Sequence, residues 1–160
     1  MYSMAVSALV RAPRTAVYRA LLDPAAVARW RVPDGMTAHV HAFDAQEGGR
    51  FRISLTYDDP TRAGKSEGRT DTYHGHFARV VADEQVVEVA EFESDDPDLR
   101  TPMTMTTTLR DVDGGTEVEI RHDGIPDRVP AADNETGTRM ALANLAAYVE
   151  SGPPDVPSTG

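Results

Sequence analysis

The spacing of apolar residues along the chain changes between two periods, and these changes divide it into strands and helices. In the segment FRISLTY, residues 51–57, apolar and polar side chains alternate strictly, so that every second residue shares a face. Weaker alternation predicts strands over 3–10, 37–43, 71–81, 85–93, 102–110 and 115–122. The turns between the last four strands carry Asp, Glu, Gly and Pro, which favour chain reversal. Six consecutive strands at this spacing predict an antiparallel meander.

Three segments have helical spacing in place of alternation. Pro13 suits the first turn of a helix over about 13–22, because the first turn needs no backbone donor from that residue. Asp23 can cap a short second helix, PAAVARW, whose first residue is again a proline. A third helix is predicted over about 133–150, with its large apolar residues along one stripe.

The order of these elements predicts an α+β domain. A strand, two short helices and six strands precede the long helix, so a curved antiparallel sheet has one face to cover and the terminal helix can cover it. A length of 160 residues suits a single domain. We place this domain at residues 1–150 and expect 151–160 to be a flexible tail. A ligand cavity often remains between a sheet and the helix that covers it.

Charge and composition narrow the range of partners. The formal charge of −10 gives an acidic surface that repels phosphate backbones and anionic membranes, so we expect neither nucleic acid nor a membrane as a partner. The chain has no cysteine, which excludes disulfides, thiolate zinc sites and a cysteine nucleophile. No apolar run approaches a membrane span and the first residues do not resemble a signal peptide, so we expect a cytoplasmic location.

Several segments spread over nearly the whole chain resemble the START-like superfamily, also called SRPBCC or the helix-grip fold. They are APRTAVYRALLDPAAVARW, FDAQEGGRFRI, GHFARVVADEQVVEVAEF, GGTEVEIRHDGIP and TGTRMALANLAAYVESG. Within the superfamily the resemblance is closest to the family named for the activator of a heat-shock-protein ATPase. It implies a sheet of about seven strands wrapped on the C-terminal helix, with a cavity between them. The superfamily includes lipid and hormone binders, polyketide cyclases and chaperone-associated domains, so the fold alone does not select an activity.

The sequence departs from this family's pattern at two places. The family often has a Thr-Trp pair in the fifth strand, where this chain has Val89-Ala90. The family's last helix often opens with Gly-Trp, where this chain has Gly137-Thr138. The loss of two large aromatic side chains predicts a roomier or differently shaped cavity.

His122 ends the apolar face of the strand in GTEVEIRHDGIP, on the same side as Val118 and Ile120. In the resembling fold this side is the concave one, under the terminal helix. Two interpretations remain open. The histidine is either a buried residue that hydrogen-bonds a loop carbonyl near Gly124, or a polar anchor, general acid or general base for a ligand.

Glu88 interrupts the apolar strand VVEVAEF and is the second candidate for acid or base. Alternation places it on one face with Ala90 and Phe92, and this face is the better suited to point inward. In a cavity, desolvation would raise its pKa, which suits acid–base work. The alternative is a glutamate directed to the edge of the sheet and paired with an arginine such as Arg52 or Arg79.

Two His-x-His pairs have the spacing of metal ligands on a strand: His39 with His41, and His74 with His76. The segment GRTDTYHGH also matches the start of a cupin metal motif, but the glutamate that should follow is absent. In a meander the two pairs lie on strands that a third strand separates. We therefore interpret the imidazoles as solvent-facing and predict no metal site.

The polar stretch 58–70 contains two motif fragments and is predicted to be an exposed loop. Gly64-Lys65-Ser66 resembles part of a phosphate-binding loop, but the pattern needs a glycine where the chain has Asp59. The same stretch fits GxSxG, but a nucleophile elbow requires a preceding strand and a following helix. We interpret both fragments as parts of a solvated loop.

A set of apolar and aromatic residues carries the main functional prediction. We expect them to line the concave face, where tyrosine hydroxyls can hydrogen-bond a guest and methionines can adapt to its shape. With His122, the set consists of Trp30, Phe51, Ile53, Leu55, Tyr57, Tyr73, Phe77, Met103, Met105 and Met140. Plain core packing is the alternative for several of them.

The preferred function is binding of a small, mostly apolar ligand between the sheet and the terminal helix, without a cofactor. One alternative is an enzyme of the polyketide cyclase or hydrolase type that uses His122, Glu88 or a tyrosine. A solvent-sealed His122 and an outward Glu88 would count against it. Another is a chaperone-linked protein-interaction module, which needs an exposed apolar patch. A homodimer is compatible with a domain of this size, but no sequence feature specifies one.

Overall fold

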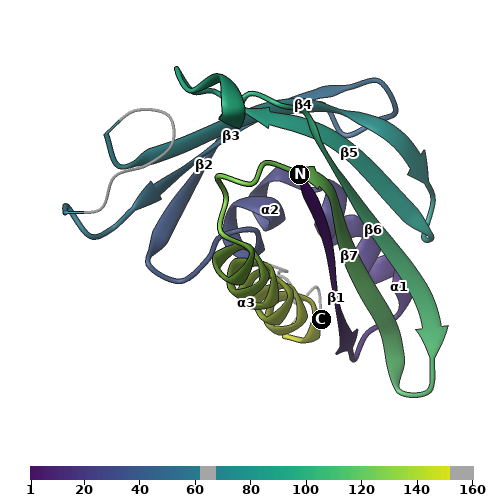
Figure 1. The fold of residues 1–160 in the computed structure, drawn as a ribbon. Coiled ribbons are helices and arrows are strands. Elements are labelled where there is room, and N and C mark those ends of the chain that lie inside the picture. Colours follow the sequence, from purple (N-terminus) through teal and green to yellow (C-terminus); the bar gives the residue numbers. More distant parts are fainter. Residues whose placement is uncertain (62–67, 152–160) are drawn as a thin grey trace.

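The computed structural model describes residues 1–61 and 68–151. One antiparallel seven-stranded sheet curves around a long C-terminal helix, which confirms the predicted α+β helix-grip fold (Figure 1). The strands are β1 (Tyr2–Val10), β2 (Met36–Phe43), β3 (Arg50–Tyr57), β4 (Thr70–Val81), β5 (Gln85–Phe92), β6 (Met103–Val112) and β7 (Gly115–Ile125). The helices are α1 (Arg14–Leu22), α2 (Pro24–Trp30), the 3₁₀ helix η1 (Pro97–Leu99) and α3 (Ala131–Glu150). Over the described ranges, no helix combines the length and apolar character needed to cross a bilayer.

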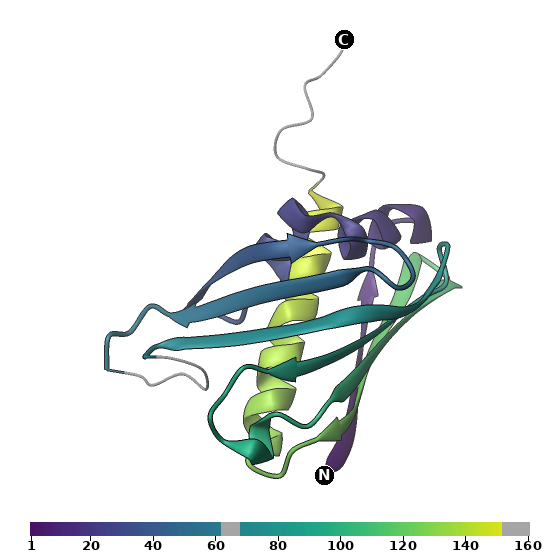
Figure 2. The ribbon, with the colours of Figure 1, turned by 90° about the horizontal axis from the view of Figure 1, so that it is seen from above.

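The sheet is a meander to which the first strand is added beside the last. The strand order is β1-β7-β6-β5-β4-β3-β2, so β2 to β7 follow one another as predicted. β1 pairs antiparallel with β7, with Val6 opposite Ile120 and Ala8 opposite Val118. The strands therefore form one continuous surface, and α3 lies across its concave side (Figures 1 and 2).

Two elements differ from the predicted boundaries. β7 continues to Ile125, beyond the predicted end at 122, because β1 pairs with it as far as Tyr2 opposite Ile125. Gly124 has a φ of 70°, a backbone conformation that glycine adopts without strain. The turn predicted after β5 contains η1, where the Asp96 carboxylate accepts a hydrogen bond from the backbone N–H of Asp98 at 3.0 Å.

The two short helices cover one end of the sheet, at the C-terminal end of α3 (Figure 2). Asp23 caps α2 as predicted, since its carboxylate accepts a hydrogen bond from the Ala25 N–H at 3.0 Å. Trp30 is 1% exposed, and its indole Nε1 donates to the carbonyl of Ala20 at 2.9 Å. This bond satisfies the buried indole and joins α2 to α1.

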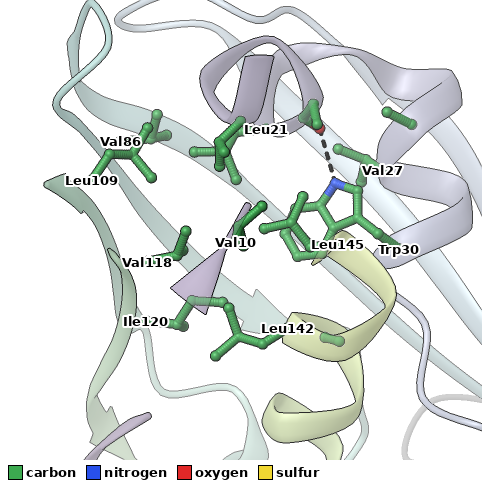
Figure 3. Close-up of a cluster of buried hydrophobic side chains, with 14 of the residues drawn as sticks. Val10, Leu21, Val27, Trp30, Val86, Leu109, Val118, Ile120, Leu142 and Leu145 are labelled. Atoms are coloured by element: carbon green, nitrogen blue, oxygen red, sulfur yellow. Dashed lines mark hydrogen bonds between the residues drawn. The ribbon is translucent and has the colours of Figure 1, made fainter. Parts of the chain in front are cut away.

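The hydrophobic core lies beneath these helices, at one end of the concave face (Figure 3). The C-terminal half of α3 contributes Leu142 and Leu145, which are 1% and 0% exposed. The sheet and the short helices contribute Val10, Val17, Leu21, Val27, Trp30, Val86, Leu109, Val118 and Ile120. Close packing at this end leaves the other half of α3 to face a different part of the sheet.

Candidate functional site

The N-terminal half of α3 faces a cavity of about 450 Å³. The cavity lies between this half of the helix and the concave face of the sheet, and strands β2 to β7 contribute to its wall. More than half of the lining residues are apolar, and the polar ones among them include four carboxylates. The helix contributes Asp133, Asn134, Thr136, Gly137, Thr138, Met140 and Ala141. One helix therefore closes the core with its C-terminal half and a cavity with its N-terminal half.

The predicted ligand-contacting set divides between this cavity and the core. The residues that line the cavity are Phe51, Leu55, Tyr57, Tyr73, Met103, Met105, His122 and Met140. Trp30, Ile53 and Phe77 are instead core residues, each at most 1% exposed. Ile53 and Phe77 lie on the concave side of the sheet as expected, whereas Trp30 belongs to α2, and all three pack in the core. Alternation identifies the side of a strand and does not tell which part of that side stays open.

The two positions at which the sequence departs from the family's aromatic pattern both lie in the cavity wall. Ala90 lines it from β5, and Thr138 lines it from α3. Small side chains stand at both positions, as the sequence indicates. Residues from opposite walls therefore leave space that two tryptophan side chains would occupy.

The strand register brings the two acid–base candidates into one row. Glu88 of β5 lies opposite Met105 of β6, and Met105 lies opposite His122 of β7. Residues opposite each other on antiparallel strands point to the same face. Glu88, Met105 and His122 therefore project together into the cavity, and all of them line it.

Glu88 forms a buried ion pair with Arg31, the residue that follows α2. Arg31 Nη1 donates to Glu88 Oε1 at 2.7 Å, and Nη2 donates to Oε2 at 3.0 Å. The Glu88 side chain is 2% exposed and the Arg31 side chain 12%. The guanidinium also lies over the Trp30 ring, with Cζ 5.1 Å from the ring centroid. Two parallel hydrogen bonds and this stacking fix the orientation of Arg31 in the cavity wall.

The partner of Glu88 is neither Arg52 nor Arg79, which corrects the sequence-based interpretation. Arg52 instead donates two hydrogen bonds to Glu93, at 2.8 and 2.9 Å. The alternation of FRISLTY contains the signal that excludes Arg52, because this residue and the inward Phe51 fall on opposite faces. No periodicity identifies Arg31, which is 57 residues from Glu88 in the chain.

One donor of the Arg31 guanidinium is left without a partner. Its Nε is buried and has no hydrogen-bond partner among residues 1–61 and 68–151. Burial by itself lowers the pKa of Arg31, but the Glu88 carboxylate and the neighbouring Tyr73 hydroxyl raise it above its ordinary value. Burial raises the pKa of Tyr73, although the Arg31 charge opposes this effect. At neutral pH the cavity wall therefore presents a charged guanidinium beside a neutral phenol.

His122 is held by α3 and not by the loop carbonyl near Gly124 that the sequence suggested. Its Nδ1 lies 3.4 Å from the side-chain nitrogen Nδ2 of Asn134. An amide nitrogen can only donate, so Nδ1 accepts and the neutral ring carries its proton on Nε2. Nε2 has no hydrogen-bond partner among the described residues. The fully buried side-chain atoms that lack a partner there are Arg31 Nε and Thr107 Oγ1, so Nε2 is not sealed from the cavity. We infer that Nε2–H opens onto the cavity that His122 lines.

The surroundings of His122 favour its neutral form. Burial, followed by the positive charge of Arg31, lowers the pKa of His122 to about 4, although the Asp123 carboxylate acts in the opposite direction. At neutral pH the ring is therefore a hydrogen-bond donor through Nε2 and carries no charge. A group with such a low pKa is also a weak general base near neutral pH.

The outer face of the sheet carries the two His-x-His pairs, on strands β2 and β4, with β3 between them as expected. The ring nitrogens of His74 lie 3.0 Å from Glu93 and 3.2 Å from Glu91. Gly75 permits close approach of the strands, because a Cβ there would come within 1.9 Å of the Val89 carbonyl oxygen. In the ranges that the structure describes, no group of three or more His, Asp or Glu side chains is arranged to hold a metal ion.

Two of the sequence-based predictions fall outside the described residues. The fragment Gly64-Lys65-Ser66, with its partial matches to a phosphate loop and to GxSxG, lies within 62–67. The predicted tail at 151–160 also lies outside the described residues, except for residue 151. The interpretation of both segments stays a prediction.

Comparisons with known proteins assign the family. The family model described as "Activator of Hsp90 ATPase homolog 1-like protein" matches residues 11–150. The chain belongs to this family. Its membership confirms the resemblance to START-like proteins that the sequence indicated. A crystal structure of a Chromobacterium violaceum protein is similar at 30% identity and a TM-score of 0.82, covering 92% of this chain and 96% of that one.

Two further solved members of the same fold are more distant in sequence. The solution structure of an AHSA1-like protein from Aeromonas hydrophila has 23% identity and a TM-score of 0.69, covering 94% of this chain and 93% of that one. A crystal structure of a Rhodobacter sphaeroides protein has 22% identity and a TM-score of 0.76, covering 93% and 92%. At these identities the likeness shows the fold alone. The comparison with curated proteins gives no match.

Proposed function

We propose that this protein binds a small, mostly apolar molecule in the cavity between the sheet and the N-terminal half of α3. The observation that carries the proposal is the cavity itself, whose volume is about 450 Å³. Small-molecule sites have volumes of roughly 300–1,000 Å³, mostly apolar walls and a few convergent polar groups. The cavity has a volume in this range and a mostly apolar wall, and its polar groups include Arg31, Glu88, Tyr73 and His122.

The apolar wall supplies a driving force for binding. Phe51, Leu55, Met103, Met105 and Met140 line the cavity from two strands, β3 and β6, and from helix α3. Covering such surface with an apolar guest contributes about 25 cal/mol per Å² removed from water. The flexible methionines can adjust to guests of different outline, which suits a cavity with walls from several elements.

A fluorescent apolar probe tests the proposal. N-phenyl-1-naphthylamine is neutral and emits strongly only outside water, so its emission should rise and saturate as the protein is titrated into it. The variant Ala90→Trp places a large ring in the cavity, and we expect it to weaken probe binding by at least about tenfold. The matched control is Val89→Trp, one residue away on the opposite face of β5, which should bind as the wild type does.

Two results would contradict the proposal that the cavity binds an apolar molecule. Equal binding by the wild type and Ala90→Trp would place the probe outside the cavity and contradict the proposal. Absence of saturable binding to a folded wild type would also contradict it. If the probe binds as expected, native mass spectrometry of the purified protein, followed by extraction, can identify a retained natural ligand.

A further inference from the structure

We propose that the natural ligand carries a neutral oxygen acceptor, such as a ketone, ester or lactone carbonyl, which accepts a hydrogen bond from His122 Nε2–H beside Arg31. This inference rests on the proposed function and names the chemical class of the guest. It follows from the hydrogen-bond donor that the cavity wall leaves unpaired and from the signs of the charges around it.

Where Glu88 and His122 enter the cavity, the wall leaves one accessible hydrogen-bond donor unpaired. Both Glu88 carboxylate oxygens already accept hydrogen bonds from Arg31, at 2.7 and 3.0 Å. His122 Nδ1 accepts from Asn134, which leaves Nε2–H as a donor without a partner in the described chain. Arg31 Nε also lacks a partner among the described residues, but it is fully buried, so His122 Nε2–H is the donor that a guest can reach. A guest that covers Nε2–H without an acceptor would leave this donor desolvated and unpaired, so a guest that supplies an acceptor gains affinity there.

The charges around the cavity select against an anionic acceptor. The lining residues include four carboxylate side chains, from Asp34, Asp71, Glu88 and Asp133. Arg31 is the one Lys or Arg among the lining residues that the structure describes, and Glu88 already pairs with it. A carboxylate on the ligand would enter a region of net negative charge and compete with Glu88 for the same guanidinium.

The same carboxylates would attract a cationic guest, but its donors find no acceptor at His122 Nε2–H. A ligand ammonium would bring a donor to His122 Nε2–H and place a positive charge near Arg31. The position of Arg31 is close enough for its charge to influence the His122 ring. The unpaired donor of His122 therefore favours an acceptor, and the carboxylates of the wall favour one without a negative charge. A carbonyl oxygen is the common neutral acceptor of this kind.

Three naphthalenes of matched shape test this inference in competition with N-phenyl-1-naphthylamine. They are 2-acetylnaphthalene, a ketone; 2-isopropenylnaphthalene, in which a methylene group replaces the oxygen; and 2-naphthoate, a carboxylate. The readout is the affinity of each for the wild type and for His122→Phe, which removes the donor and keeps a planar ring. His122→Gln serves as the matched variant that retains an N–H donor.

We expect His122→Phe to weaken the ketone by about tenfold, the magnitude of one hydrogen bond, and to leave the hydrocarbon within about twofold. The Gln variant should retain part of the ketone's affinity. The carboxylate should bind the wild type more weakly than the ketone at pH 8. Equal losses for ketone and hydrocarbon, or a carboxylate that binds more tightly than the ketone, would overturn the inference while the proposed function stands.

A measurement on the wild type does not depend on the variants folding. The ¹⁵N resonance of His122 Nε2 should shift when the ketone is added and not when the hydrocarbon displaces the probe. Displacement by the ketone with no change at Nε2 would reject the hydrogen bond. If neither the probe nor any naphthalene binds, the proposed function fails and the inference fails with it.

Discussion

His122 enters the cavity as a neutral ring because burial and the nearby Arg31 charge both disfavour its protonated form. Asn134 adds a second constraint, since its amide donates to Nδ1 and leaves the proton on Nε2. The protein thus controls both the charge and the tautomer of one side chain, with groups from α2, α3 and β7. His122 therefore presents its Nε2–H group to the cavity as a hydrogen-bond donor with a fixed direction.

The lowered pKa of His122 predicts how stability depends on pH. In the unfolded chain this histidine binds a proton near pH 6.5, whereas in the folded protein it does so only near pH 4. The free energy of unfolding should therefore decrease as the pH falls from about 6.5 to 4. The complete loss, reached below both pKa values, should be roughly 3 kcal/mol. Urea unfolding of the wild type and His122→Phe at a series of pH values measures this. The free-energy difference between the two should shift in favour of the variant over that range, and parallel curves would contradict the prediction.

Arg31 and Glu88 depend on each other because both are withdrawn from water. Arg31→Met leaves a carboxylate buried without a counter-ion, and we expect it to lower the free energy of unfolding by about 3–5 kcal/mol. Replacing both residues, as in Arg31→Met with Glu88→Leu, should restore most of this loss, since two apolar side chains need no partner. Denaturant unfolding of the two single variants and the double variant measures the coupling.

The exposed pair formed by Arg110 and Glu117 provides the control for this experiment. Arg110→Met should change the stability by no more than about 1 kcal/mol, because solvent screens an exposed ion pair. If Arg31→Met proves as mild as Arg110→Met, then the Glu88 carboxylate is not isolated from water in the way described here.

At the scale of elements, α3 combines two roles along one helix. Its C-terminal half buries Leu142 and Leu145 in the core, while its N-terminal half forms one wall of the cavity. β5 is divided in the same way, with Val86 in the core and Glu88 and Ala90 at the cavity. The division arises because α1 and α2 fill the concave face at one end only.

This division predicts that neighbouring helix positions respond differently to truncation. Leu142→Ala removes a fully packed side chain and should cost about 2–5 kcal/mol of stability. Met140→Ala removes a side chain that borders open space, so it should cost less than about 1.5 kcal/mol and mainly change probe affinity. Chemical denaturation and probe titration of both variants measure the two effects. A Met140→Ala loss as large as that of Leu142→Ala, with unchanged probe binding, would mean that this half of α3 packs as core.

At the scale of the whole molecule, the sheet, the three helices and the cavity depend on one long-range arrangement. β1 joins β7 across more than a hundred residues of intervening chain, with Val6 opposite Ile120. This pairing extends the concave surface over which α3 lies (Figure 1). Membership of the family assigns the architecture, but it does not specify which residues form the cavity wall of this protein.

The sequence by itself determined the elements and the faces of the strands. Alternation located β3 and identified the inward side of β5, because side-chain direction in a strand repeats every two residues. The Asp23-Pro24 start of α2 could also be predicted from the sequence, since a helix cap involves only residues that are close together in the chain. Small residues at Ala90 and Thr138 were visible as departures from a family pattern.

Only the tertiary structure decided which inward residues meet a cavity and which partners the polar ones take. Ile53 and Phe77 share the concave side with Met105, but they pack in the core together with Trp30 of α2, whereas Met105 lines the cavity. The partners that matter, Arg31 for Glu88 and Asn134 for His122, come from helices packed on the sheet. Their contacts depend on where those helices end in space, and no local period of the sequence encodes that position.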